Sequence, residues 1–150
     1  MAIRRHGEAI RPDMRYRQRP GVYAVIARGD QALLTFQQQP APEFQLPGGG
    51  IDAGESTLQA LYREVFEETG WRVAAPRRLG AYRRFTYMPE YDLWAEKVCH
   101  IYLAQPVRRH GEPDEPGHAA VWAPIRLVPE MLASEGDRAF VLHFLDRFRT

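Results

Sequence analysis

The alternation of hydrophobic and polar residues predicts a chain that mixes strands and helices. Short apolar runs rich in β-branched and aromatic residues, typical of strands, occupy residues 22–27, 31–36, 79–87, 93–103 and 119–122. A helical period predicts helices over residues 56–69, 127–133 and 137–148. Strands and helices interleaved in 150 residues indicate one domain, residues 1–150, of the α/β or α+β class.

Polar, proline-rich or glycine-rich segments separate these elements. Residues 28–30 form a predicted turn, the prolines in 37–44 predict a loop, and 46–54 form a glycine-dense turn. The charged segment 108–118 is expected to be an exposed loop. Residues 1–20 are Arg-rich without a clear period, which indicates an N-terminal extension or arm, or a solvated tail.

The helix over 56–69 gathers three carboxylates on one side. At about 100° per residue, the apolar residues from Leu58 to Phe66 share one face. Glu64, Glu67 and Glu68 fall within an arc of about 100° that is expected to point away from the core. They are three and four positions apart, so their side chains are neighbours and repel one another unless a cation is present.

Composition narrows the classes of function. A net charge of +1 argues against a nucleic-acid coat, and one cysteine excludes an internal disulfide or a multi-cysteine zinc site. The sequence contains no apolar run of the roughly 20 residues that a membrane helix needs. The basic N-terminus is also not followed by the apolar stretch of a signal peptide. Together these features predict a soluble cytoplasmic protein.

The glutamate cluster has two interpretations. It is a solvated acidic face, or it is a set of hard oxygen ligands suited to Mg²⁺ or Mn²⁺. The glycine run 48–50 favours the second, because three glycines let the backbone approach a metal or phosphate, although a plain tight turn is the alternative.

From Gly49 to Trp71 the residues match a family motif. The stretch reads Gly49, five residues, Glu55, seven residues, then Arg63-Glu64-Val65-Phe66-Glu67-Glu68-Thr69-Gly70-Trp71. It resembles the Nudix box at every fixed position, with Trp71 where an aliphatic residue is more usual. The chain is therefore similar to the Nudix hydrolase family.

This resemblance implies an α/β/α sandwich with a mixed sheet and a loop–helix–loop metal site. It implies Mg²⁺, or Mn²⁺, bound by Glu64, Glu67 and Glu68, with a backbone carbonyl near Gly48 or Gly49. It also implies that Arg63 orients the glutamates by ion pairing, that Glu55 holds the loop, and that Gly70 ends the helix.

Residues outside the motif are candidates for substrate contact. Tyr87 and Pro89 point, respectively, to diadenosine polyphosphates and ADP-ribose within the family, and Arg84 could contact phosphate. Glu67 or Glu68 could be the general base; outside the box Glu112 and Glu115 come first, then Glu90 and Glu96. The histidines show no metal-ligand spacing, although His118 could touch substrate.

The resemblance implies a Mg²⁺-dependent pyrophosphohydrolase that cleaves a nucleoside diphosphate linked to another group. The substrate candidates are a dinucleoside polyphosphate, ADP-ribose or a nucleotide sugar, and a nucleoside triphosphate. A non-catalytic Nudix-fold sensor that binds a nucleotide is the alternative. The expected partner is a small molecule, without a membrane or nucleic-acid surface, and a homodimer stays open.

Overall fold

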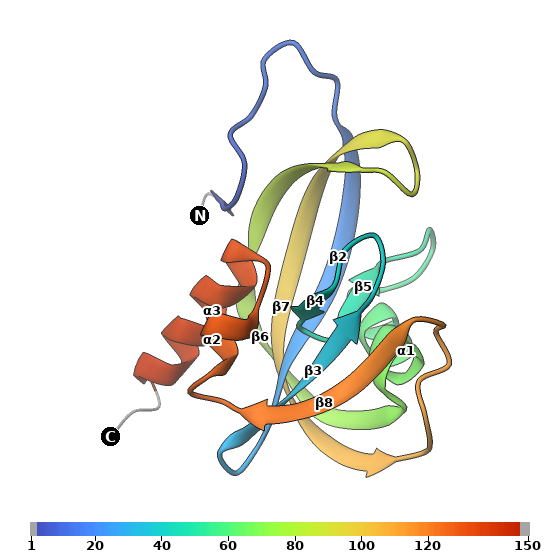
Figure 1. Ribbon diagram of the computed structural model, residues 1–150, viewed down its shortest axis with the longest axis vertical. Helices are drawn as coiled ribbons and strands as arrows, with labels where there is room; N and C mark the ends of the chain where they lie inside the picture. Colours follow the sequence, from blue (N-terminus) through green and yellow to red (C-terminus); the bar gives the residue numbers. More distant parts are fainter. Residues whose placement is uncertain (1–2, 148–150) are drawn as a thin grey trace.

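Eight strands of the described chain form one mixed sheet. The computed structural model describes residues 3–147, and its strands join in the order β1-β6-β7-β2-β3-β4, with β5 paired to β2 and β8 to β3 (Figure 1). The strands are β1 (Arg4–Arg5), β2 (Arg17–Arg28), β3 (Gln31–Gln37), β4 (Glu43–Gln45), β5 (Gly48–Gly50), β6 (Trp71–Met88), β7 (Leu93–Arg109) and β8 (His118–Pro124).

Helices cover both faces of this sheet. Figure 1 shows α1 (Thr57–Thr69) on one side, with α2 (Val128–Met131) and α3 (Glu135–Arg147) on the other. Alternate residues of β2 explain the two layers: Val22 and Ile26 pack with Leu61 of α1, whereas Val25 packs in the cluster that contains Val141 of α3. The expected α/β/α sandwich is confirmed.

The capping residues of α1 agree with the sequence. Ser56 is the N-cap and forms a capping box with Gln59, and Gly70 ends the helix in the left-handed conformation at φ 75°. The C-terminal helix is confirmed to Arg147, and Phe148, which the period also includes, lies outside the described residues.

Two segments predicted as turn or loop contain strands. The glycine run forms β5, in which Gly48 pairs with Tyr23 and Gly50 with Gly21. Glu43–Gln45, at the end of the proline-rich segment, forms β4 against β3. Both strands have three residues, too short for a hydrophobic period to register.

The N-terminal segment is attached to the sheet at two places. Arg4 and Arg5 pair with β6, and Arg17 begins a parallel pairing of β2 with β7 that continues to Ile26. Between them, the ring of Tyr16 packs on that of Phe85, with centroids 4.9 Å apart. This stretch is therefore more than a solvated tail. No helix in the described part of the chain is long and apolar enough to span a membrane.

Candidate active site

The carboxylates of α1 lie closer to the core than the helical wheel predicts. Glu68 is 6% exposed and lies among the buried residues of the helix, whereas Leu58 and Tyr62 are exposed. The expectation that all three glutamates point away from the core is therefore wrong. The helix packs on β2 and β5 through the narrower side that contains Ala60, Leu61 and Val65, and this side includes Glu68.

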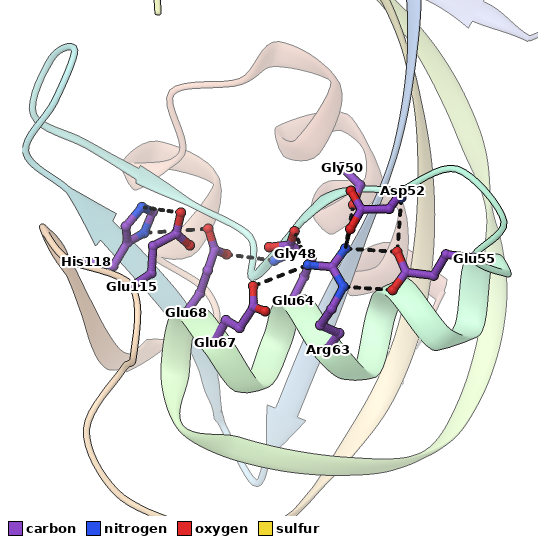
Figure 2. Close-up of polar contacts among 10 residues, drawn as sticks. All are labelled: Gly48, Gly50, Asp52, Glu55, Arg63, Glu64, Glu67, Glu68, Glu115 and His118. Atoms are coloured by element: carbon purple, nitrogen blue, oxygen red, sulfur yellow. Dashed lines mark hydrogen bonds and ion pairs between the residues drawn. The ribbon is translucent and has the colours of Figure 1, made fainter.

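Arg63 is the centre of the ion-pair network at this site (Figure 2). Its Nε and Nη2 donate to the two carboxylate oxygens of Glu55 at 2.7 and 2.9 Å. Its Nη1 donates to Glu64 at 2.8 Å and to Glu67 at 3.2 Å, and its Nη2 also donates to the Gly50 carbonyl at 3.0 Å. One guanidinium thus ties the loop after β5 to the glutamates of α1.

The Arg63–Glu55 pair is strongly charged. The hydrogen bonds from Arg63, together with the Asp52 amide that donates to Glu55, lower the pKa of Glu55 to about 2. The same pair raises the pKa of Arg63 above its ordinary value, so both groups stay ionised at neutral pH.

The glycine strand β5 brings backbone directly against the carboxylates. The Gly48 amide donates to Oε1 of Glu68 at 2.9 Å. A Cβ at Gly48 would meet the Val22 carbonyl oxygen at 2.1 Å, and one at Gly49 would meet the Glu64 carboxyl carbon at 2.4 Å. Gly48 therefore has to be glycine for β5 to lie against β2, and a side chain at Gly49 would displace the Glu64 carboxylate.

Burial disfavours the ionised form of two of these carboxylates, those of Glu64 and Glu68. Desolvation is the largest cause that raises the pKa of Glu64, and it raises the pKa of Glu68 well above the ordinary value. The neighbouring acidic groups raise both pKa values further, while Arg63 and the Gly48 amide act in the opposite direction. A divalent cation is the group that would offset this accumulation of negative charge.

Glu115, just before β8, and His118, the first residue of β8, complete the cluster. One ligand atom from each of Glu68, Glu115 and His118 lies within 4.8 Å of the others. His118 Nδ1 is 3.5 Å from Glu68 Oε2, yet it is buried and has no hydrogen-bond partner in the described chain. An imidazole nitrogen and carboxylate oxygens fit Mn²⁺ as well as Mg²⁺, so the residues present suit a divalent cation.

The candidate residues outside the motif differ in whether they reach the site. A cleft with a volume of about 370 Å³ adjoins this cluster. Arg84, Tyr87 and Glu115 are among the residues that line it. Glu112 is not among the residues that line it, and its side chain is 84% exposed and paired with Arg109 at 2.6 Å. The structure therefore brings Glu115, and not Glu112, to the site, because backbone bonds from Asp114 and Glu115 to the Glu67 carbonyl hold the loop there.

Sequence reasoning missed several residues that line the cleft. They are polar or aromatic side chains of β2, β3, β4 and β7: Tyr23, Gln37, Glu43, Gln45 and Lys97. The outward alternation of β2 could have identified Tyr23, but the short strand that contains Glu43 and Gln45 has no pattern of its own.

Comparisons with known proteins agree with this geometry. The family model described as the NUDIX domain matches residues 17–144. The chain is 34% identical over 74 residues to a Bacillus subtilis protein provisionally named an 8-oxo-dGTP diphosphatase, a match that covers 49% of this chain and 50% of that protein. It is 40% identical over 67 residues to the RNA pyrophosphohydrolase of Halorhodospira halophila, covering 45% of this chain and 37% of the relative.

Solved structures match over a longer stretch. A mutator MutT protein from Bacillus halodurans superposes with a TM-score of 0.70 at 25% identity, covering 85% of this chain and 82% of that one. A NUDIX hydrolase from Nitrosomonas europaea has a TM-score of 0.73 at 22% identity, with 87% and 90% covered, and shows the fold alone. The chain spans half or less of the length of the two curated relatives above.

Proposed function

Because the chain belongs to the NUDIX domain family, we propose that it is a divalent-metal-dependent hydrolase of nucleotide diphosphate linkages. The observation that carries the proposal is the set of three glutamates on α1, in which Arg63 pairs with Glu64 and Glu67 and the Gly48 amide of the glycine strand donates to buried Glu68. Two relatives are named as a diphosphatase and a pyrophosphohydrolase, which supports cleavage of a phosphoric anhydride bond.

Mg²⁺ or Mn²⁺ is the proposed cofactor, held by Glu64, Glu67 and Glu68. Such a cation, when bound, neutralises phosphate oxygens and lowers the pKa of water. Without a cation, three carboxylates on one helix face would repel a diphosphate. The neighbouring backbone carbonyls of Gly48 and Gly49 stay candidate ligands.

The protein groups then have distinct tasks. Arg63 positions Glu64 and Glu67 through ion pairs, and Glu55 positions Arg63 in turn. Glu115, which is half exposed and lines the cleft, can accept the proton of the attacking water. The water oxygen bonds to phosphorus, the bridging P–O bond breaks, and its electrons leave with the second phosphate group.

The substrate candidates stay as the sequence predicts them: a dinucleoside polyphosphate, ADP-ribose or a nucleotide sugar, and a nucleoside triphosphate. Arg84 and Tyr87 are proposed substrate contacts because both line the cleft. A single domain over residues 1–150 and a cytoplasmic location remain predictions of the sequence, which leaves a homodimer open.

The alternative is a sensor that binds a nucleotide without cleaving it. The presence of every box glutamate supports the hydrolase, since loss of the metal-binding carboxylates is the simplest way to lose turnover. A nucleotide that raises the melting temperature but is recovered unchanged would favour the sensor.

The test is hydrolysis of a panel of these nucleotides with Mg²⁺, with products identified by mass. We expect Glu68→Gln to lose at least about a hundredfold in kcat/KM, since it removes a ligand of the proposed cation. Glu130→Gln, on the exposed side of α2, is the matched control and should keep wild-type activity. Equal activity of the two variants, or a wild type that cleaves nothing, would contradict the proposal.

A further inference from the structure

A second cavity lies between α3 and the sheet, away from the cleft. Its volume is about 270 Å³, and β6, β7 and α3 supply the residues that line it. Figure 1 shows α3 on the face of the sheet opposite α1. None of the residues that line this cavity also lines the cleft beside the glutamates. The hydrolysis proposed above therefore makes no use of it.

Part of the cavity is apolar and preformed. Four partly buried hydrophobic side chains line it: Leu79, Leu103, Phe140 and Phe144. The Phe140 ring packs on that of Tyr82, with centroids 6.0 Å apart. A Cβ at Gly80 would meet Phe140 Cε1 at 2.9 Å, so the missing side chain lets this ring lie directly against β6. An apolar group of a ligand would therefore find a fixed surface here.

Basic side chains line the same cavity from the sheet and from the helix. Arg77 is the cross-strand partner of Leu103, which packs on the core cluster of the α3 side, so Arg77 is on the helix-facing side of the sheet. His143 and Arg147 follow Phe140 by three and seven positions, which places them on the same face of α3. A guanidinium from each wall therefore faces one space.

These two guanidinium charges are not neutralised within the described chain. Neither Arg77 nor Arg147 forms an ion pair or a side-chain hydrogen bond with another of residues 3–147, and none of the described residues that line the cavity is Asp or Glu. Arg78 also lines it, but its Nη1 donates to His100 Nδ1 at 3.0 Å. Like charges that face each other repel, and an anion between Arg77 and Arg147 would remove that repulsion.

The lining determines the chemistry of this anion. Guanidinium groups only donate hydrogen bonds, and their forked geometry matches phosphate oxygens. A phosphate monoester has three terminal oxygens and can accept from both arginines and from His143, whereas a carboxylate has two oxygens in one plane. The volume of about 270 Å³ lies just below the roughly 300–1,000 Å³ that is usual for ligand pockets, so the carbon body has to be small.

We propose that this cavity is a second ligand site, which binds a small phosphate monoester with an apolar carbon body, such as an aryl phosphate. Arg77, His143 and Arg147 bind the phosphate, and the rings of Phe140 and Phe144 contact the carbon body. Because the site shares no lining residue with the cleft, binding there does not depend on the proposed hydrolysis.

Calorimetry with phenyl phosphate as the probe tests the site. EDTA is present, so that no divalent cation can bind the probe at the α1 glutamates. We expect Arg77→Gln and Arg147→Gln each to weaken binding by about tenfold to a hundredfold, because each removes a charge-assisted hydrogen-bond donor.

Arg108→Gln is the matched control for charge. Arg108 is also an exposed strand arginine without a polar side-chain contact in the described chain, but it does not line the cavity. We expect this variant to bind phenyl phosphate as tightly as the wild type does.

Two related probes test the two parts of the ligand. Inorganic phosphate lacks the ring, and benzoate has a carboxylate in place of the phosphate. Both should bind wild type more weakly than phenyl phosphate by about tenfold or more. Equal affinity for inorganic phosphate would overturn the role of the apolar lining, and equal affinity for benzoate would overturn the preference for phosphate.

Amide NMR spectra locate the bound probe. Titration with phenyl phosphate should shift the signals of residues 77–79 and 140–147. Shifts confined to residues that line the cleft, no binding by the wild type, or an equal loss of affinity in Arg77→Gln and Arg108→Gln would overturn the proposal.

Discussion

Gly49→Ala tests whether the site depends on close contact between β5 and α1. The added Cβ would lie 2.4 Å from both Cδ and Oε2 of Glu64 and 2.9 Å from Oε1. An ordinary contact begins at 3.4 Å, so the carboxylate has to move by about 1 Å. That displacement would also strain its 2.8 Å bond to Arg63.

The expected magnitude follows from this displacement. A misplacement of about 1 Å at a reacting centre can lower the rate by about a hundredfold, equivalent to about 2.7 kcal/mol. We expect Gly49→Ala to lose that factor in kcat/KM for nucleotide hydrolysis. Its Mn²⁺ affinity, titrated by electron paramagnetic resonance, should fall as well, since Glu64 is a proposed ligand.

The neighbouring glycine provides the control. A Cβ at Gly50 would meet nothing within 4 Å, so Gly50→Ala adds the same methyl group to the same strand without touching Glu64. We expect this variant to retain activity and Mn²⁺ affinity. If both alanine variants behaved alike in both assays, the contact between Gly49 and Glu64 would not control the site, and the reasoning would be refuted.

Three further predictions concern pH, metal binding and stability. Arg63 lowers the pKa of Glu55 to about 2. The stability that Glu55 contributes is therefore present above its pKa in the unfolded chain, about 4.3, and is lost as pH falls toward 2. Glu55→Gln should flatten the acid side of a melting-temperature profile from pH 6 to 2. His118→Gln removes the imidazole beside Glu68 and should weaken Mn²⁺ binding by about tenfold or more, measured by paramagnetic titration. The Tyr82 hydroxyl donates to buried Asp137 at 2.7 Å, so Tyr82→Phe should lower the free energy of unfolding in urea by about 1–3 kcal/mol.

Each of these variants has an exposed counterpart. Glu130→Gln, His143→Gln and Tyr62→Phe make the same chemical changes at exposed helix positions and should leave the corresponding measurement unchanged. A target variant that could not be distinguished from its counterpart would show that the contact described has no energetic role.

The motif helix could be predicted from sequence because its signals are local. Ser56 and Gly70 cap the two ends of the helix. The motif match also identifies the residues that face Arg63. Its packed side could not be predicted so well, because Leu58, Tyr62 and Phe66 widen the apolar arc on the wheel. Only the docking of β5 decides that Glu68 is buried and Tyr62 exposed.

Residues outside the motif depend on long-range pairing that no local pattern encodes. Glu112 and Glu115 are alike in sequence, and two backbone bonds to the Glu67 carbonyl decide which approaches the cluster. His118 shows no metal spacing, since its partner Glu68 lies 50 positions earlier. Glu43 acquires its surroundings only when β4 pairs with β3.

The parallel pairing of β2 with β7 also sets the order in which this chain can fold. Every pair in that register joins residues 78 positions apart, as Tyr23 and Ile101 are. At about 5–20 residues per second, synthesis separates the two partners by roughly 4–16 s. During that interval the apolar strand β2 can pair locally only with β3 and β5, through short registers.

The nascent chain therefore exposes the edge of β2 before β7, the strand that pairs with this edge, has been synthesised. Fragments that end before Leu93 lack β7 altogether and would present the edge of β2 to other chains. Completion of the sheet, and with it the joining of the two sides of the cleft, has to wait until β7 has emerged.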